Sequence, residues 1–184
     1  MTESELAAIV IDHLEAVRAD YLLVGGIACN LYGIPRSTQD ADFVVSIGAA
    51  ELDALLRRLP EAFAVEPQAK MELFTGTMRW VVAIGGTALK VEFFLLGNDP
   101  HHREEFQRRR RAWLPLVERE AWVACPEDLI IQKLRWARGK DLEDVRSILA
   151  VSGDVLDVGY LHGWCAQHRT LARLLEIRRS IPEI

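Results

Sequence analysis

The stretch over residues 21–45 (YLLVGGIACNLYGIPRSTQDADFVV) constrains the fold of this 184-residue chain more than any other segment. A short apolar run ends in Gly25 and Gly26, a helix-length segment follows, and Asp40 and Asp42 then open a second apolar run. This order lets a glycine turn and two carboxylates from neighbouring strands meet at one place. Such an arrangement can hold a nucleotide phosphate and a divalent metal ion, so the stretch indicates phosphoryl chemistry.

The hydrophobic pattern along the chain predicts an α+β fold with a mixed sheet. Strands are expected at 21–24, 41–47, 62–65, 78–84, 88–96 and 121–124, with a Gly-Gly hairpin turn at 85–86. Helices are expected at 3–18, 27–33, 49–59 and 100–111, and then at about 126–137, 141–150, 157–168 and 170–179. We therefore expect a sheet domain over residues 1–115, with a helical C-terminal region over 116–184 packed on it.

Composition and charge limit the classes of function. Half of the residues are hydrophobic and the net charge is −5, which argues against bulk non-specific binding to nucleic acid but leaves room for a local basic patch. The three cysteines are far apart and form no CxxC pair, so neither a disulfide framework nor a zinc site is expected. Acidic residues in the first turn argue against a signal peptide, and no apolar run reaches membrane-spanning length. A reduced, cytoplasmic setting is the expectation.

Asp40, Asp42 and Glu92 are the candidate metal ligands. Two positions apart on a strand, Asp40 and Asp42 share one face, and a divalent cation would remove their mutual repulsion. Glu92 stands in a strand that otherwise reads as apolar, where an unpaired charge is costly, so it is the candidate third carboxylate. Oxygen-only ligands suit Mg²⁺. The structural alternatives are that Asp40 only starts the strand while Asp42 faces solvent, and that Glu92 pairs with Lys90.

The glycine turn and the loop before Asp40 are the candidate phosphate ligands. Gly25 and Gly26 allow close backbone approach, and the helix that follows them offers free N–H groups. Arg36 could clamp a phosphate with two hydrogen bonds, and Thr38 lies beside it in the same loop. A plain tight turn, and a salt bridge from Arg36 to a nearby carboxylate, are the competing explanations.

Together these residues resemble the nucleotidyltransferase superfamily, which has the DNA polymerase β-like fold. Its pattern is an apolar strand, Gly-Gly or Gly-Ser, a short helix, Asp-x-Asp on the next strand and a third carboxylate on a later one. The loop RSTQD over residues 36–40 resembles the R-x-T-x-D form of a bacterial branch that includes the AbiEii-type toxins. The resemblance departs from the pattern at Gly26, where serine is usual, and at Glu92, where aspartate is common.

The segment CPEDLIIQKLRWARGKDLEDVRSIL resembles the helical motif of the same branch, at Lys133, Lys140, Asp141 and Asp144. The resemblance implies that Lys133 is a triphosphate ligand. It also implies an active-site role for Asp141, either orienting Lys133, which we favour, or acting as general base on the acceptor. The structural alternatives are a solvated helix lysine at 133 and a helix N-cap at 141.

The resemblance implies a Mg²⁺- or Mn²⁺-dependent enzyme that transfers a nucleoside monophosphate from an NTP to an RNA acceptor, with a tRNA 3′ end as the first candidate, in a toxin–antitoxin setting. One alternative is an antitoxin-like enzyme that modifies a partner protein. Another is a degenerate nucleotide-binding module without turnover. A basic groove beside the carboxylates would favour RNA, and an exposed apolar patch there would favour a protein acceptor.

Three other features are expected to be structural. His101 and His102 are interpreted as surface residues at a helix start, because a metal pair would prefer i, i+4 spacing. The run 108–111 (RRRR) is interpreted as a solvated helix face, with Glu104 and Glu105 placed four residues earlier for ion pairs, and with contact to an RNA backbone as the alternative. The tryptophans are expected mainly in packing, at positions 113, 122, 136 and 164.

Overall fold

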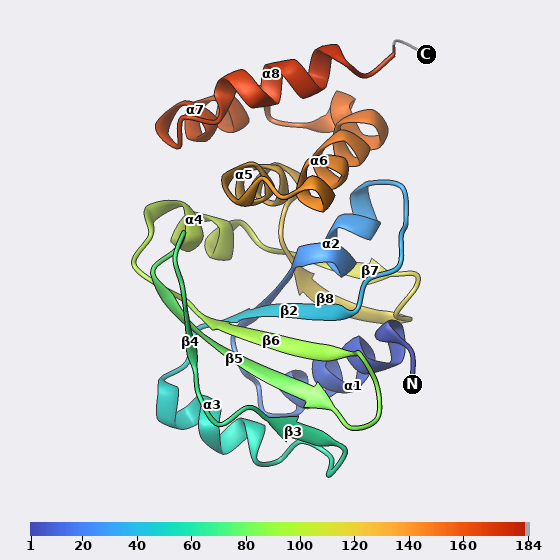
Figure 1. Cartoon of the computed structure of the whole chain (residues 1–184), viewed down its shortest axis with the longest axis vertical. Helices are drawn as coiled ribbons and strands as arrows, with labels where there is room; N and C mark the ends of the chain where they lie inside the picture. Colours follow the sequence, from blue (N-terminus) through green and yellow to red (C-terminus); the bar gives the residue numbers. More distant parts are fainter. Residues whose placement is uncertain (183–184) are drawn as a thin grey trace.

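The computed structural model describes residues 1–182 and shows one mixed sheet with helices on both sides (Figure 1). The strands are β1 (Tyr21–Val24), β2 (Asp40–Val45), β3 (Phe63–Val65), β4 (Lys70–Glu72), β5 (Thr77–Ile84), β6 (Lys90–Leu95), β7 (Arg110–Leu114) and β8 (Arg119–Val123). The helices are α1 (Glu3–Ala16), α2 (Gly25–Tyr32), α3 (Ala49–Leu56), α4 (Pro100–Arg108), α5 (Pro126–Trp136), α6 (Gly139–Ser152), α7 (Val158–Gln167) and α8 (Leu171–Arg179), with a 3₁₀ turn at Gly153–Val155.

The sheet runs in the order β3-β5-β6-β2-β1-β8-β7, and β4 pairs with β5. Strand β1 is antiparallel to β2 and parallel to β8, while β2 and β6 are parallel over six residue pairs. The β2–β6 register sets Asp42 directly beside Glu92. Because side chains alternate along a strand, Asp40 and Asp42 lie on one face, and Phe43 packs against Phe93 on the other at 5.8 Å between ring centroids.

Helices α1 and α3 lie on one side of the sheet, and α2 and α5–α8 lie on the other (Figure 1). Helix α1 starts with a capping box in which Thr2 and Glu5 exchange hydrogen bonds, and it buries a stripe that includes Leu6, Val10 and Leu14. Helix α5 is buried from Pro126 through Leu134, so it forms the centre of the helical layer. The core is continuous from α1 through the sheet to α5 and α6.

The expected α+β class is confirmed, with two differences in the elements. The expected helix over 100–111 ends at Arg108, and residues 110–114 instead form β7, because Arg109 turns to an extended ψ of 147° and pairing with β8 takes over. A short strand, β4, was not expected. The sheet includes β8, and the helical run begins at Pro126. No helix among residues 1–182 has the length and apolar character needed to cross a membrane.

The prediction that His101 and His102 are surface residues is wrong. His101 is 0% exposed and His102 3%, because α4 is packed between the sheet and the helical layer. His101 bonds through Nε2 to Asp128 at 3.1 Å and packs against the Trp164 ring. Burial lowers the pKa of His102 to about 4, so this ring is neutral at pH 7 and accepts the Gly97 N–H through Nδ1.

The prediction of a solvated basic helix face over 108–111 is wrong for the helix and for Arg108 and Arg109, whereas Arg110 and Arg111 are exposed but lie on β7. Arg108 binds Glu127 and Asp128 on α5, whereas Arg109 binds Asp20. Glu105 is buried and accepts a hydrogen bond from Gln132 instead of pairing with Arg109. Arg108 thus joins α4 to α5, and Arg109 joins the end of α4 to the residue before β1. The tryptophans at 122, 136 and 164 are partly buried, but Trp113 is 56% exposed.

Candidate functional site

A cleft between the sheet and the helical layer brings together most of the predicted site residues. Its volume is about 330 Å³ and its walls come from α2, β2, β5, β6, α5 and the start of α6. Predicted residues that line it are Gly26, Arg36, Thr38, Asp40, Asp42, Glu92 and Lys133. The other two predicted residues lie directly behind the wall, Gly25 against Asp42 and Asp141 against Lys133.

Asp42 is the most perturbed carboxyl group of the cleft. Burial raises its pKa to about 7, and the neighbouring Glu92 and Asp40 add to the shift. The effect of Glu92 on the pKa follows from the parallel pairing of β2 and β6, because this pairing fixes the Asp42 and Glu92 side chains next to each other. Three neighbouring carboxylates repel one another when all are ionised, and a bound cation would reduce this repulsion.

Gly25 and Gly26 have no room for a side chain. A Cβ at Gly25 would stand 1.9 Å from Asp42 Oδ2, and its φ of +67° is in the left-handed region that favours glycine. A Cβ at Gly26 would stand 2.9 Å from Thr38 Oγ1. The turn therefore packs the start of α2 against Asp42 and Thr38. Val24 provides no side-chain cap, so the first N–H groups of α2 have no capping partner from that residue.

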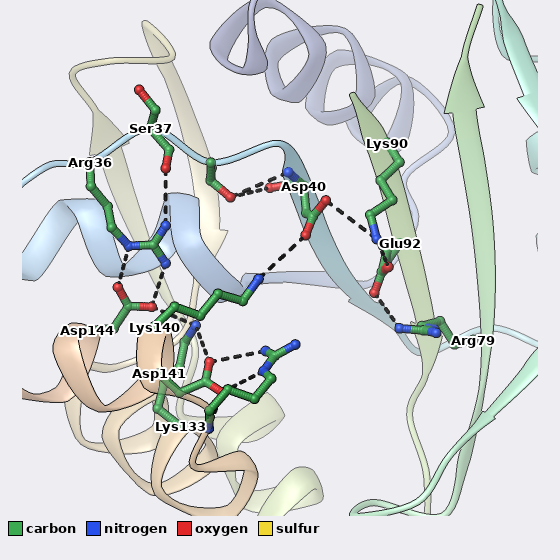
Figure 2. A network of polar contacts seen from close by, with 12 residues as sticks. Arg36, Ser37, Asp40, Arg79, Lys90, Glu92, Lys133, Lys140, Asp141 and Asp144 are labelled. Atoms are coloured by element: carbon green, nitrogen blue, oxygen red, sulfur yellow. Dashed lines mark hydrogen bonds and ion pairs between the residues drawn. The ribbon is translucent and has the colours of Figure 1, made fainter. Parts of the chain in front are cut away.

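Cationic side chains surround the carboxylates of β2 and β6 (Figure 2). Glu92 binds Arg79 at 2.9 Å and Lys90 at 2.8 Å, so the expected alternative of a Lys90 pair is what the side chains form. Lys90 also lies 3.6 Å from Asp40, and Lys140 reaches to 4.0 Å from Asp40 across the cleft. Among residues 1–182, no three His, Cys, Asp or Glu side chains are arranged to hold a metal ion in these rotamers.

A buried ion network lies behind the cleft, where α5 and α6 meet the loop before β2 (Figure 2). Asp144 accepts two hydrogen bonds from Arg36, at 2.6 and 2.7 Å, and lies 2.8 Å from the Lys133 ammonium. Lys133 is only 3% exposed and also binds Asp141 at 3.2 Å, so it is not a solvated helix lysine. Burial acts to lower the pKa of Lys133, but nearby anionic groups, including Asp144, raise it and keep the ammonium charged.

Asp141 has two structural partners besides Lys133. Helix α6 begins at Gly139, and the Asp141 carboxylate reaches back to the Arg138 N–H at 3.1 Å and to the Arg138 guanidinium at 2.7 Å. Asp141 therefore caps the helix from its third position instead of standing at the N-cap itself. The same carboxylate also accepts a hydrogen bond from the Lys133 ammonium at 3.2 Å.

Several residues of the cleft wall were not found from the sequence. Arg79 could have been suspected, because it is a lone charge in an apolar strand, the same signal that marks Glu92. Phe74, Trp136 and Arg138 also line the cleft. Phe74 follows the three-residue strand β4, which the hydrophobic pattern of the sequence does not show. Asp144 was not predicted as the partner of Arg36, because the two residues are 108 positions apart in the chain.

Comparisons with known proteins place this architecture among solved structures. No protein-family model matches the sequence, and no curated protein is significantly similar to it. The fold is similar to that of the antibiotic-resistance factor ANT(2″)-Ia in solution, with a TM-score of 0.62 at 16% identity over 97% of this chain and 96% of that chain. It is also similar to ANT(2″)-Ia in complex with adenylyl-2″-tobramycin, with a TM-score of 0.60 at 15% identity over 92% and 98% of the two chains.

A third similar structure is the lincosamide antibiotic adenylyltransferase LnuA with lincomycin bound. The TM-score is 0.56 at 15% identity, over 83% of this chain and 99% of that chain. All three matches cover most of both chains, so they concern the whole architecture and not one motif. The TM-scores show a shared fold, and identities of 15–16% carry the likeness no further than the fold. The chain therefore has the fold of the nucleotidyltransferases.

Proposed function

We propose that this protein transfers a nucleoside monophosphate from an NTP to an acceptor hydroxyl and releases pyrophosphate. The observation that carries the proposal is the close approach of the Gly25 turn to Asp42. Asp40 lies on the same strand as Asp42, and Glu92 lies beside Asp42 on the neighbouring strand. A turn that is sterically locked against a carboxylate cluster in the wall of a cleft suits a metal-bound triphosphate.

The charge of the cleft supports a polyanionic ligand. The chain carries a net charge of −5, yet the cleft is lined by six basic and four acidic side chains. The basic side chains are Arg36, Arg79, Lys90, Lys133, Arg138 and Lys140, and the acidic ones are Asp40, Asp42, Glu72 and Glu92. A bound triphosphate would replace the carboxylates as the partner of these cations. Arg138 and Lys140 are half exposed, so their side chains have the most freedom to move toward the phosphates.

Asp40 and Asp42 fit Mg²⁺ or Mn²⁺ as ligands. They are hard oxygen donors on one face, and Asp42 is held in an environment that a cation would relieve. Glu92 joins them only if it releases Arg79 or Lys90. When bound, the divalent ion polarises phosphate oxygens and lowers the pKa of the acceptor hydroxyl.

The side chains and backbone of the cleft supply binding and orientation. The N–H groups at the start of α2 and the Arg36 and Lys133 cations hold the phosphates, while Asp141 keeps Lys133 in place. The acceptor oxygen forms a bond to the α-phosphorus as the bond from that phosphorus to the bridging oxygen breaks. Pyrophosphate leaves with the bond electrons, and the hydroxyl proton passes to water.

We propose RNA, with a tRNA 3′ end as the specific candidate, as the acceptor, in a toxin–antitoxin system of the AbiEii type. The basic lining of the cleft and the R-x-T-x-D loop over residues 36–40 support it. A cytoplasmic setting supplies the NTP and the metal ion. An exposed apolar patch on the β4–β5 hairpin, formed by Met71, Leu73 and Phe74, of which Phe74 lines the cleft, favours the second candidate, a partner protein as acceptor. ANT(2″)-Ia and LnuA add antibiotics as acceptors to be tested.

The test is transfer of label from each of four α-³²P-labelled NTPs with Mg²⁺. Parallel reactions contain total RNA, total cell protein, tobramycin or lincomycin. We expect labelled RNA with α-labelled but not γ-labelled NTP, and a loss of at least about 100-fold in Asp42→Ala. Asp53→Ala, which removes an exposed carboxylate on α3, is the matched control and should keep full transfer.

Label that persists in Asp42→Ala would refute the assignment of the carboxylate cluster. Calorimetry provides the second measurement. Saturable binding of Mg²⁺–NTP without transfer to any acceptor would show the degenerate nucleotide-binding module, and absence of binding would refute the proposed function as a whole.

A further inference from the structure

The tip of the β4–β5 hairpin presents an exposed phenylalanine that is held in place by its backbone. Phe74 is 48% exposed and lines the cleft. The Glu72 carboxylate accepts the N–H groups of Phe74 at 2.9 Å and Thr75 at 2.7 Å, which closes the four-residue turn. Exposed loop tips are normally mobile and polar, so a fixed, half-exposed aromatic ring at this position calls for a ligand.

The β4–β5 hairpin rises from the sheet toward the helical layer (Figure 1), and its tip is joined by a hydrogen bond to α5. Arg135 donates a hydrogen bond to the Phe74 carbonyl, and the same guanidinium binds Asp99 at 2.9 Å. Arg135 is only 9% exposed and Asp99 14%, so this anchor is protected from solvent. The aromatic ring is thus placed by contacts to the folded core and not by the loop alone.

Trp136 lines the same cleft from the last position of α5. The Arg138 guanidinium lies 5.3 Å from the centre of its ring and is itself held by Asp141 at 2.7 Å. Between them, Ala137 adopts φ 53°, a left-handed conformation that is uncommon for alanine. This turn ends α5 so that Trp136 and Arg138 both face the cleft.

Glu72 lies next to both aromatic residues. Burial acts to raise the pKa of Glu72, but hydrogen bonds from Thr75 and from the Phe74 N–H, together with the nearby Trp136 side chain, hold it below its usual value. The carboxylate is therefore charged and is occupied by its own hairpin turn. Phe74, Trp136 and Glu72 all line the cleft, and Phe94 adds a third aromatic side chain to its lining.

We propose that Phe74 and Trp136 form a stacking subsite for the nucleobase of the NTP. The inference rests on the proposed function, since it assigns the base to a place beside the phosphate-binding residues of the same cleft. A planar, heteroaromatic ligand covers the exposed Phe74 ring and stacks on indole, whereas the cations and the Gly25 turn face the phosphates. Every base has a π-face on which an aromatic ring can stack, so these two rings discriminate only weakly among the four NTPs.

The test separates base from phosphate by comparing Mg²⁺–NTP with inorganic tripolyphosphate, both titrated by calorimetry. In Phe74→Ala we expect the Kd for each Mg²⁺–NTP to rise about tenfold, the loss of one stacking contact, with the Kd for tripolyphosphate unchanged. Phe74→Tyr should restore wild-type affinity. Leu73→Ala is the matched control, because Leu73 is on the same turn, 85% exposed and outside the cleft lining, and it should change neither Kd.

Tryptophan fluorescence gives an independent readout. Nucleotide should quench the emission of the wild-type protein more than tripolyphosphate does, and Trp136→Phe should remove that difference. In a transfer assay, Phe74→Ala should raise KM for NTP with kcat little changed, because the ring binds the base and does not act on the reacting atoms.

Four outcomes decide the matter. A rise in the Kd for NTP alone supports the subsite. Unchanged NTP binding in Phe74→Ala overturns it and leaves the proposed function standing. Equal weakening of NTP and tripolyphosphate also overturns it, because the ring would then only support the shape of the cleft. If the wild-type protein binds neither ligand, the proposed function fails and the subsite with it.

Discussion

At position 25 the backbone passes so close to Asp42 that no other residue can be accommodated without moving the carboxylate. We expect Gly25→Ala to destabilise the protein by about 3 kcal/mol, because the new methyl group collides with Asp42 Oδ2 and alanine disfavours a φ of +67°. Urea unfolding measures the loss, and calorimetry with Mg²⁺–NTP should show weakened binding.

Gly86→Ala is the matched control for that substitution. Gly86 has a similar φ of +73°, but a Cβ added there would meet no atom within 4 Å, so only the backbone cost remains, about 1 kcal/mol. Equal losses of stability in the two variants would show that contact with Asp42 is not what requires glycine at 25.

The Asp42 carboxyl also makes a signed prediction for pH. Its pKa is raised from 3.8 to about 7 by burial and by Glu92, so the folded state holds the proton more tightly than the unfolded chain. Its contribution to the free energy of unfolding is therefore full below about pH 4 and is lost as the pH rises toward 7. We expect Asp42→Asn to be less dependent on pH than the wild type over this range, as measured by urea unfolding at successive pH values without divalent ions. If the free energy of unfolding changed equally with pH in both proteins, the raised pKa of Asp42 would be contradicted.

Single residues show where prediction from sequence succeeds and where it stops. Glu92 stands out because a lone acid in an apolar strand needs a partner, and this signal is local. The partner of Arg36 is not local, since Asp144 is 108 residues away. His101 was misplaced for a similar reason, because the Asp128 and Trp164 groups that bury it come from helices far along the chain.

Among the elements, α5 and α6 are joined by a buried lysine between two aspartates. We expect Lys133→Met to cost about 3–5 kcal/mol, because Asp141 and Asp144 would lose a buried cationic partner. Thermal unfolding followed by circular dichroism measures the effect. Arg57→Met breaks an exposed pair with Asp53 and should cost less than about 1 kcal/mol. A Lys133→Met variant as stable as Arg57→Met would mean that Lys133 is dispensable to the fold.

Element types were predicted well where the pattern is local, as in the strand, glycine turn and helix over residues 21–33. The failure at β7 has a physical cause. Arginine is a good helix former, so the run 108–111 extends the expected helix, but pairing with β8 over five residues overrides that preference. The β4–β5 turn was missed because β4 has only three residues and buries none of them, so it leaves no hydrophobic signal.

The whole molecule should unfold as one cooperative unit. Sheet and helical layer share a single core in which α5 is buried along nearly its whole length, so neither part keeps its apolar surface covered alone. We expect urea curves from far-ultraviolet circular dichroism and from tryptophan fluorescence to coincide. A separate early transition that disappears in Trp164→Phe would instead show that the helical region, in which Trp164 lies on α7, unfolds independently.

The parallel pairing of β2 with β6 has a further consequence, for protein synthesis. Asp42 and Glu92 are neighbours in space but fifty positions apart in the chain, and Lys133 arrives later still. A nascent chain on the ribosome holds the glycine turn and both aspartates well before it can close the cleft around them. The cleft is therefore completed in one late step of translation, after α5 and α6 have left the exit tunnel, and we expect truncated products of the same message to lack it.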